Sequence, residues 1–136
     1  MQFAAAYITA LVVFLLLDAA WLSTMANMLY RPVLGDIVLP SLRVWPAVAF
    51  YAMFPIGIVA FAVIPALKSS AVGTAVIYGL VFGAIAYGTY DLTNYATLRN
   101  WNLQITVIDI VYGAIASAIA GAAATLVARG AASWTG

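Results

Sequence analysis

Four long apolar stretches follow one another along the chain, and short polar segments separate them. The stretches cover about residues 3–25, 45–67, 71–98 and 102–128. At a rise of about 1.5 Å per residue, each is long enough to cross a hydrocarbon core of about 30 Å. The pattern predicts an all-α integral membrane protein with four transmembrane helices in an antiparallel bundle, forming a single transmembrane domain over residues 1–136.

The connections between the stretches differ in length and composition. The longest, residues 26–44, contains Pro32 and Pro40, which argue against one continuous helix, although a short interfacial helix would fit there. Lys68–Ser70 leaves room only for a tight turn, so the second and third spans should form an antiparallel hairpin. Pro55, near the middle of the second span, predicts a kink in that helix.

Composition supports a membrane protein and excludes several kinds of chemistry. The chain is 67% hydrophobic and carries five basic and four acidic residues, and its mean hydropathy is +1.11. The surface should therefore face a lipid bilayer, and it has no basic patch for nucleic acid. Because the chain has no cysteine and no histidine, it lacks disulfides, thiolate or imidazole catalysis and the usual zinc ligands. We expect no cofactor and no metal centre.

All four acidic residues are aspartates, and three of them lie within the predicted spans. Asp18 and Asp91 each lie seven residues before the end of a span, and Asp109 lies seven residues after the start of the antiparallel fourth span. The helical rise places all three about 10 Å below the same membrane face. A charged group at such depth costs roughly 2.5–3.5 kcal/mol. The three carboxyls should therefore be protonated, paired with arginine or bridged by a cation.

Polar and aromatic side chains at helical spacing extend this layer of aspartates. Residues three or four apart share a helix face, so such neighbours of each aspartate should lie in the same layer. The candidate ligand-binding residues are Asp18, Trp21, Tyr87, Asp91, Asn94, Tyr95, Thr106, Asp109 and Tyr112. Arg31 and Arg99 lie toward the same membrane face and are candidates for ion pairs or for contacts with anionic groups.

Small residues recur at four-residue spacing on two of the spans. Gly79 and Gly83 form a GxxxG pair in the third span, and Gly113, Ser117 and Gly121 continue the same spacing in the fourth. Such residues let two helices approach closely. They predict either a homodimer interface or close packing inside one chain, and the sequence leaves both open.

The basic residues are divided almost evenly between the two membrane faces. Arg31, Arg43 and Arg99 lie toward the aspartates, whereas Lys68, Arg129 and the N-terminal amine lie toward the other face. By the positive-inside rule, the face near the aspartates is cytoplasmic by a narrow margin.

Three blocks carry a resemblance to a known family. They are Leu16-Leu-Asp-Ala-Ala-Trp-Leu22, Tyr90-Asp-Leu-Thr-Asn-Tyr-Ala-Thr-Leu98 and Trp101-x-x-x-x-Thr-x-x-Asp109. From Phe14 to Gly113 the chain resembles a family of small four-helix bacterial inner-membrane proteins known only as a domain of unknown function. The resemblance implies a four-helix fold in the bacterial cytoplasmic (inner) membrane, and it transfers no catalytic role.

Three functions remain open at this point. In the first, the aspartate layer binds or conducts a small ligand, such as a cation, an amine or a proton, because carboxylate, amide and hydroxyl oxygens suit these ligands. In the second, the protein is a membrane enzyme that acts on lipid, with an aspartate as general acid or base. In the third, it is an accessory or assembly subunit whose polar layer only joins the helices. We favour the first, because three acids are more than assembly requires. An enzyme is less favoured, because a nucleophile and an activated metal are both hard to find, so enzymatic activity is left uncertain.

Overall fold

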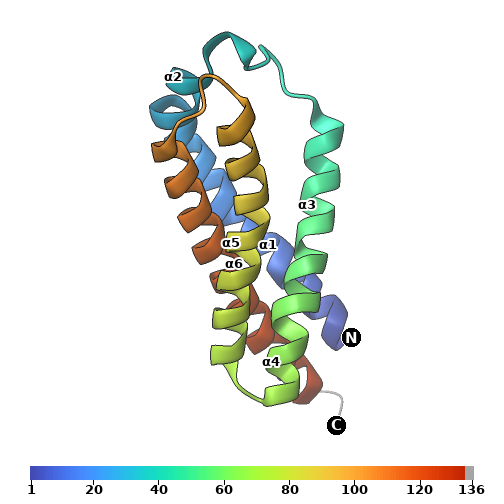
Figure 1. Ribbon diagram of the computed structural model, residues 1–136. Coiled ribbons are helices and arrows are strands. Elements are labelled where there is room, and N and C mark those ends of the chain that lie inside the picture. The colour runs from blue at the N-terminus through green and yellow to red at the C-terminus, as the bar shows by residue number, and fades with distance from the viewer. Residues whose placement is uncertain (134–136) are drawn as a thin grey trace.

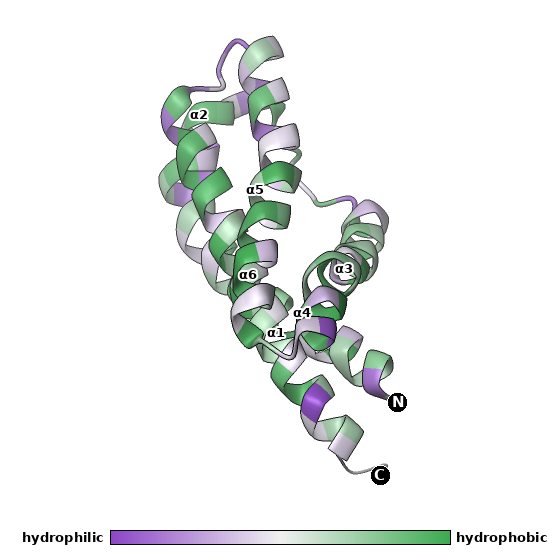
Figure 2. Cartoon of the chain, turned by 60° about the horizontal axis from the view of Figure 1, so that its bottom comes forward, coloured by the Kyte–Doolittle hydropathy of each residue, from purple (hydrophilic) through white to green (hydrophobic). Residues whose placement is uncertain are grey.

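The computed structural model describes residues 1–133, and its helices run up and down through four spans (Figure 1). The spans Gln2–Ile37, Val44–Ser69, Val72–Thr97 and Leu103–Ser133 are long and apolar enough to cross a membrane. Residues 1–133 contain no strand. The predicted all-α membrane fold is therefore confirmed. Hydrophobic residues dominate the helices, and the connection between the last two spans is hydrophilic (Figure 2).

The first span is longer than predicted. Helix α1 (Gln2–Met25) continues through a π-helical turn, η1 (Ala26–Tyr30), into α2 (Arg31–Leu34) and a 3₁₀ turn, η2 (Gly35–Ile37). The predicted connection over residues 26–44 is wrong for its first part, since the chain leaves helical structure only after Ile37. The wider π turn, in which the Arg31 N–H bonds the Ala26 carbonyl, explains how the helix continues. It accommodates Pro32, which cannot donate a hydrogen bond and whose ring would crowd the turn before it.

The second span uses the same arrangement. Helix α3 (Val44–Ile58) is followed by a π-helical turn, η3 (Val59–Val63), and by α4 (Ile64–Ser69). Pro65 follows η3 at the same distance as Pro32 follows η1. Pro55 lies inside α3, close to its end. The sequence predicts a kink at Pro55. The structure shows a π-helical turn at residues 59–63, between Pro55 and Pro65.

Two short connections complete the bundle. Ser70, in the left-handed conformation with φ of 57°, joins α4 to α5 (Val72–Thr97), so the predicted tight turn is confirmed. At the other end, the Asn102 side chain accepts a hydrogen bond of 2.9 Å from the Ile105 N–H and caps α6 (Leu103–Ser133). Helix α6 extends beyond the predicted end at residue 128.

The α5 and α6 backbones touch along a strip of small residues. A Cβ atom added to Gly83 would lie 2.3 Å from the Gly113 carbonyl oxygen, and one added to Gly79 would lie 2.8 Å from the Ala118 Cα. The residues predicted to form a close helix contact are all buried within the chain: Gly79, Gly83, Gly113, Ser117 and Gly121. This strip is therefore used inside the monomer. A homodimer stays a prediction and would have to use another surface.

The apolar core lies where α1, η3 and α6 meet. Phe14 and Ile58 are fully buried there, against a row of buried alanines on α6. The Phe14 ring lies 4.6 Å from that of Phe54 on α3, measured between centroids. Above this core, toward residues 38–43, α3 diverges from α5 (Figure 1). The core thus holds one half of the bundle together, and the aspartates lie in the other half.

Candidate functional site

The structure places the three aspartates in one half of the bundle, on its inner faces. Asp18 belongs to α1, Asp91 to α5 and Asp109 to α6, and their exposed fractions are only 6%, 0% and 5%. Asp18 and Asp109 lie close enough for their charges to interact, and so do Asp91 and Asp109. Asp36 differs, because it is exposed on η2. The predicted gathering of three carboxyls is thus present in the fold.

Asp109 is held by a chain of hydrogen bonds from the first span. The Tyr30 hydroxyl donates to Asp109 Oδ1, and the Trp21 indole N–H donates to the Tyr30 hydroxyl at 3.1 Å. This chain connects α1, η1 and α6. Trp21 was among the predicted residues, but Tyr30 was not.

The π turn explains why Tyr30 faces the aspartates. In a regular α-helix with about 100° per residue, Tyr30 would point roughly 120° away from Asp18. A π turn adds one residue to a helical turn, which brings Tyr30 back to roughly 20° from Asp18. From the sequence, Tyr30 falls within the predicted connection over residues 26–44. The signal that could have found it is Pro32, since a proline two residues later favours a widened turn before it.

Asp18 is held by two tyrosines from other spans. The Tyr51 hydroxyl of α3 donates to Asp18 Oδ2, and the Tyr112 hydroxyl of α6 donates to Oδ1 at 3.0 Å. Trp21 stacks on the Tyr112 ring with 4.2 Å between ring centroids and 7° between the planes. Sequence reasoning included Tyr112 and missed Tyr51, because the second span has no charged residue to mark which of its faces is polar.

Asp91 has no such donor. Both of its carboxylate oxygens are buried, and neither accepts a hydrogen bond from the residues that the structure describes. Its ionisable neighbour is Asp109, which is also only an acceptor when ionised. A hydrogen bond between the two carboxyls therefore requires that one of them holds a proton.

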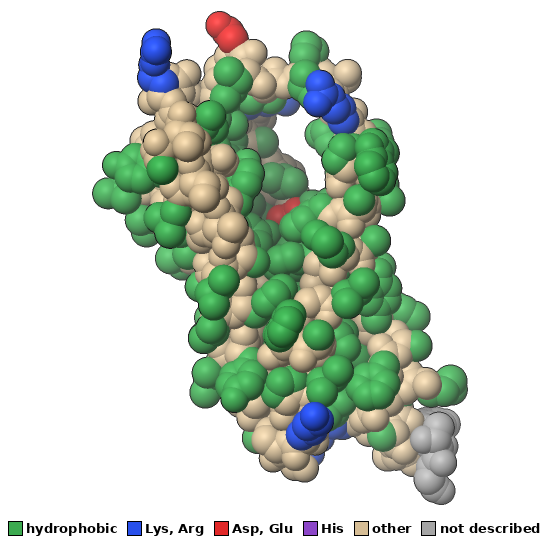
Figure 3. Space-filling model, turned by 45° about the vertical axis from the view of Figure 1, so that its right-hand side comes forward, with side chains coloured by type: hydrophobic (Ala, Val, Ile, Leu, Met, Phe, Trp, Pro, Cys, Tyr) green, Lys and Arg blue, Asp and Glu red, His purple; other side chains and the backbone are tan. Residues whose placement is uncertain are grey.

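No basic side chain compensates these carboxyls in the described part of the chain. Arg31, Arg43 and Arg99 are exposed, and no ion pair joins any aspartate to an arginine or lysine between residues 1 and 133. The basic side chains gather at the two ends of the molecule (Figure 3). The ion pairs considered for Arg31 and Arg99 are therefore not formed, and their contact with anionic groups at the membrane face stays a prediction.

The other predicted residues of α5, Tyr87, Asn94 and Tyr95, differ in how far they are buried. The Tyr87 ring covers Gly113, where an added Cβ would lie 2.2 Å from it, and its centroid lies 6.0 Å from that of Tyr112. Asn94 is half-buried. Tyr95 is exposed over 46% of its surface, so its ring is not enclosed with the aspartates.

Thr106 takes part in a separate network at the start of α6. It accepts a hydrogen bond of 3.1 Å from the Trp101 indole N–H and donates one of 2.9 Å to the Asn102 carbonyl. Trp101, which the sequence analysis did not select, is buried and packs edge-on against Tyr90 with 5.6 Å between centroids. This network closes the end of the α5–α6 hairpin above the aspartates.

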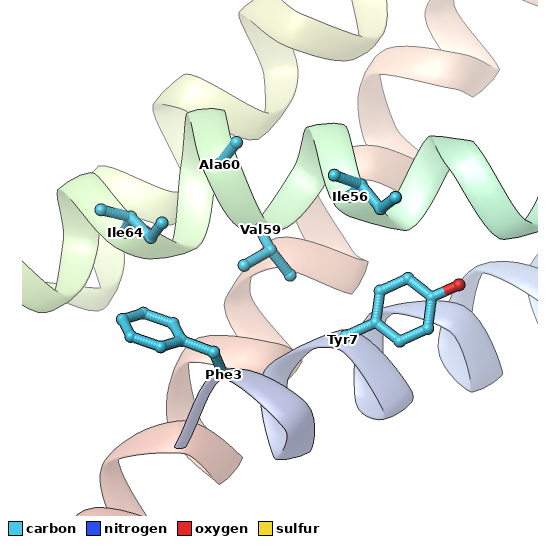
Figure 4. Close-up of a pocket in the computed structure, with 6 residues that line it drawn as sticks. All are labelled: Phe3, Tyr7, Ile56, Val59, Ala60 and Ile64. Atoms are coloured by element: carbon cyan, nitrogen blue, oxygen red, sulfur yellow. The ribbon is translucent and has the colours of Figure 1, made fainter. Parts of the chain in front are cut away.

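An apolar pocket of about 270 Å³ lies at the opposite end of the bundle (Figure 4). Its lining residues are Phe3, Tyr7, Ile56, Val59, Ala60 and Ile64. Tyr7 donates its hydroxyl to the Ala52 carbonyl at 2.8 Å. The pocket has no charged group in its wall, and it does not belong to the aspartate site.

Comparison with known proteins gives the family of the chain and no reaction. The chain matches no curated protein and no solved structure. A family model matches residues 3–126, which include the three buried aspartates and both π turns. The chain therefore belongs to the family described as "Predicted membrane protein (DUF2177)".

Proposed function

We propose that this protein, in the bacterial inner membrane, binds or conducts a small cation or proton at the buried aspartates. The observation that carries the proposal is the state of Asp91, which is fully buried with both carboxylate oxygens lacking a donor. A buried ionised carboxylate without donor or counter-charge is costly. A proton or cation bound at Asp91 removes that cost.

The pairing of Asp91 with Asp109 supports the same proposal. Two neighbouring carboxylates repel each other when both are ionised. One proton shared between them removes one charge and gives each carboxyl a hydrogen-bond partner. Tyr30 still donates to Asp109 in that state. The pair is thus suited to hold one positive charge.

Binding has more support than conduction through this monomer. Toward the Lys68 end, the α5 and α6 backbones touch, with Gly83 lying directly against Gly113 and Ser117. Such contact leaves no passage between these two helices below the aspartates. Conduction would need another route, such as one at an interface with a second chain.

An assembly role is the second candidate, and it is favoured by one observation at Asp18. This carboxyl accepts hydrogen bonds from Tyr51 and Tyr112 and so joins α1, α3 and α6. If assembly were the whole function, the aspartates would stabilise the fold without responding to any ligand.

Thermal unfolding of the purified protein in detergent tests the proposal. Its melting temperature should rise when the pH is lowered or when a monovalent cation is added, because a ligand of the folded state stabilises it. Asp91→Asn should assemble and lose this response. Asp36→Asn, which makes the same charge change at an exposed position, should behave like the parent. An unchanged response in Asp91→Asn would refute the role of Asp91.

A further inference from the structure

A hollow opens on the side of the molecule between α3 and α5, below residues 38–43 (Figure 3). It exists because α3 has little contact with α5, whereas the second span reaches α5 mainly through η3 and α4, toward the other end of the bundle (Figure 1). An acidic side chain is visible at the floor of the hollow. Among the buried aspartates only Asp18 and Asp109 retain exposed surface, so the side chain at the floor of the hollow belongs to one of these two neighbours.

Two tyrosines contact the Asp18 carboxylate, and further aromatic rings pack on these two. Tyr51 and Tyr112 donate to it, Trp21 stacks on Tyr112, and Phe50 lies against Tyr51 with 5.2 Å between ring centroids. All four rings are only partly buried. They come from α1, α3 and α6, so their packing around one carboxylate is a property of the folded bundle.

Asp18 has hydrogen-bonding capacity left after these contacts. A carboxylate offers about four acceptor positions, and the structure fills two of them with tyrosine hydroxyls. The tyrosines supply donors but no positive charge. Within the described part of the chain, no lysine or arginine pairs with Asp18. A ligand that brings both N–H donors and a positive charge would complement it.

We propose that the hollow binds an amphiphile with a positively charged amine, whose ammonium group contacts Asp18 between the aromatic rings. Aromatic faces attract cations, and the attraction is stronger where water is excluded. The hollow opens sideways between two apolar helices, so the alkyl chain of such a ligand would remain in the bilayer.

The surroundings of Asp18 favour an alkylammonium ion over a metal ion. Metal ions such as Ca²⁺ and Mg²⁺ require six or more oxygen ligands. The contacts of Asp18 offer only its own carboxylate and the hydroxyls of Tyr51 and Tyr112, which is too few oxygens for such an ion. This proposal goes beyond the proposed function, because it adds a second ligand to the layer of aspartates. It assigns the amine to Asp18 and leaves Asp91 and Asp109 for the proton or cation.

Dodecylammonium is a suitable probe, with dodecanol as its uncharged match. We would measure the melting temperature of the protein in phosphatidylcholine nanodiscs as each is added. Dodecylammonium should raise the melting temperature of the parent in a saturable way, and dodecanol should not.

Asp18→Asn should weaken the binding of dodecylammonium about tenfold or more. Asp36→Asn should bind it like the parent. Equal shifts with dodecanol, or in Asp18→Asn, would show that only the alkyl chain matters and would overturn the proposal.

Two further variants separate amine binding at Asp18 from the proposed binding of a proton or cation at Asp91 and Asp109. Asp91→Asn should keep dodecylammonium binding while losing the response to pH or inorganic cations, so each proposal can fail alone. Tyr51→Phe keeps the Asp18 carboxylate and removes one of its donors, so it should bind dodecylammonium at least as tightly as the parent. If Asp18→Asn does not assemble, Tyr51→Phe tests the proposal instead. Loss of dodecylammonium binding in Tyr51→Phe would overturn it.

Discussion

At the scale of single residues, the three buried aspartates differ in how many donors they receive. Asp18 accepts hydrogen bonds from two tyrosine hydroxyls, Asp109 from one, and Asp91 from none. A tyrosine hydroxyl lowers the cost of burying a carboxylate but does not neutralise its charge. Tyrosine donors therefore help the bundle to bury Asp18 and Asp109 without internal cations, whereas Asp91 lacks this compensation.

The Tyr30 hydroxyl should contribute measurably to stability. Tyr30→Phe removes the donor to Asp109, and hydrogen bonds to charged groups contribute about 1.5–3 kcal/mol. The free energy of unfolding in mixed micelles should fall by about that amount. Tyr95→Phe removes a hydroxyl from an exposed ring and should change stability by less than about 0.5 kcal/mol. Equal effects of the two substitutions would mean that the Tyr30–Asp109 contact does not stabilise the fold.

At the scale of helices, two irregular features position the site. The π turn η1 orients Tyr30 toward Asp109, and the strip of small residues brings α5 and α6 into backbone contact. Because of this contact, Asp91 and Asp109 face each other across the α5–α6 interface. The distance between α5 and α6 therefore determines how closely the carboxyls of Asp91 and Asp109 approach each other.

A methyl group in the α5–α6 contact should weaken the bundle. At Gly83 the added Cβ would lie 2.3 Å from the Gly113 carbonyl oxygen, so Gly83→Ala must push the helices apart. We expect a loss of about 1–3 kcal/mol in the free energy of unfolding. Gly73→Ala is the matched control on the same helix, where no atom lies within 4 Å of the added Cβ. It should be neutral or stabilising by up to about 1 kcal/mol. A neutral Gly83→Ala would refute the close contact.

At the scale of the whole molecule, the bundle has two different ends. One end carries Arg31, Arg43 and Arg99 and lies near the aspartates and the hollow, whereas Lys68 and Arg129 lie toward the other. Which end faces the cytoplasm decides from which side a water-soluble ion or proton would reach the site. The positive-inside rule favours the end with the three arginines, by a narrow margin.

Single cysteines can determine the orientation, because the chain has none of its own. Ser41→Cys and Ser70→Cys place a thiol in exposed connections at opposite ends. In intact cells, a membrane-impermeant maleimide should label the Ser70→Cys variant, and Ser41→Cys should react only after the cells are opened. The reverse result would overturn the predicted orientation. Labelling of both variants from the same side would contradict the four-span topology.

The sequence alone was sufficient for the four spans and for the placement of three aspartates at a similar level along them. Both follow from local quantities, namely hydropathy along the chain and the constant rise of an α-helix. Asp18, Asp91 and Asp109 could therefore be placed in one layer before any contact was known. The family match over residues 3–126 includes the whole range of the resemblance, Phe14 to Gly113.

Only the tertiary structure decided how the aspartates are satisfied and how the small residues are used. Tyr30 lies 79 residues from Asp109 in the sequence, and Tyr51 lies 33 residues from Asp18. Such contacts depend on how each helix is rotated about its axis, and the π turn changes that rotation within the first span. Whether Gly83 faces a second chain or α6 likewise depends on packing, since either contact would use the same small surface. Hydropathy carries no information on rotation in a helix that is apolar on every side, so these features appear only when the helices are packed together.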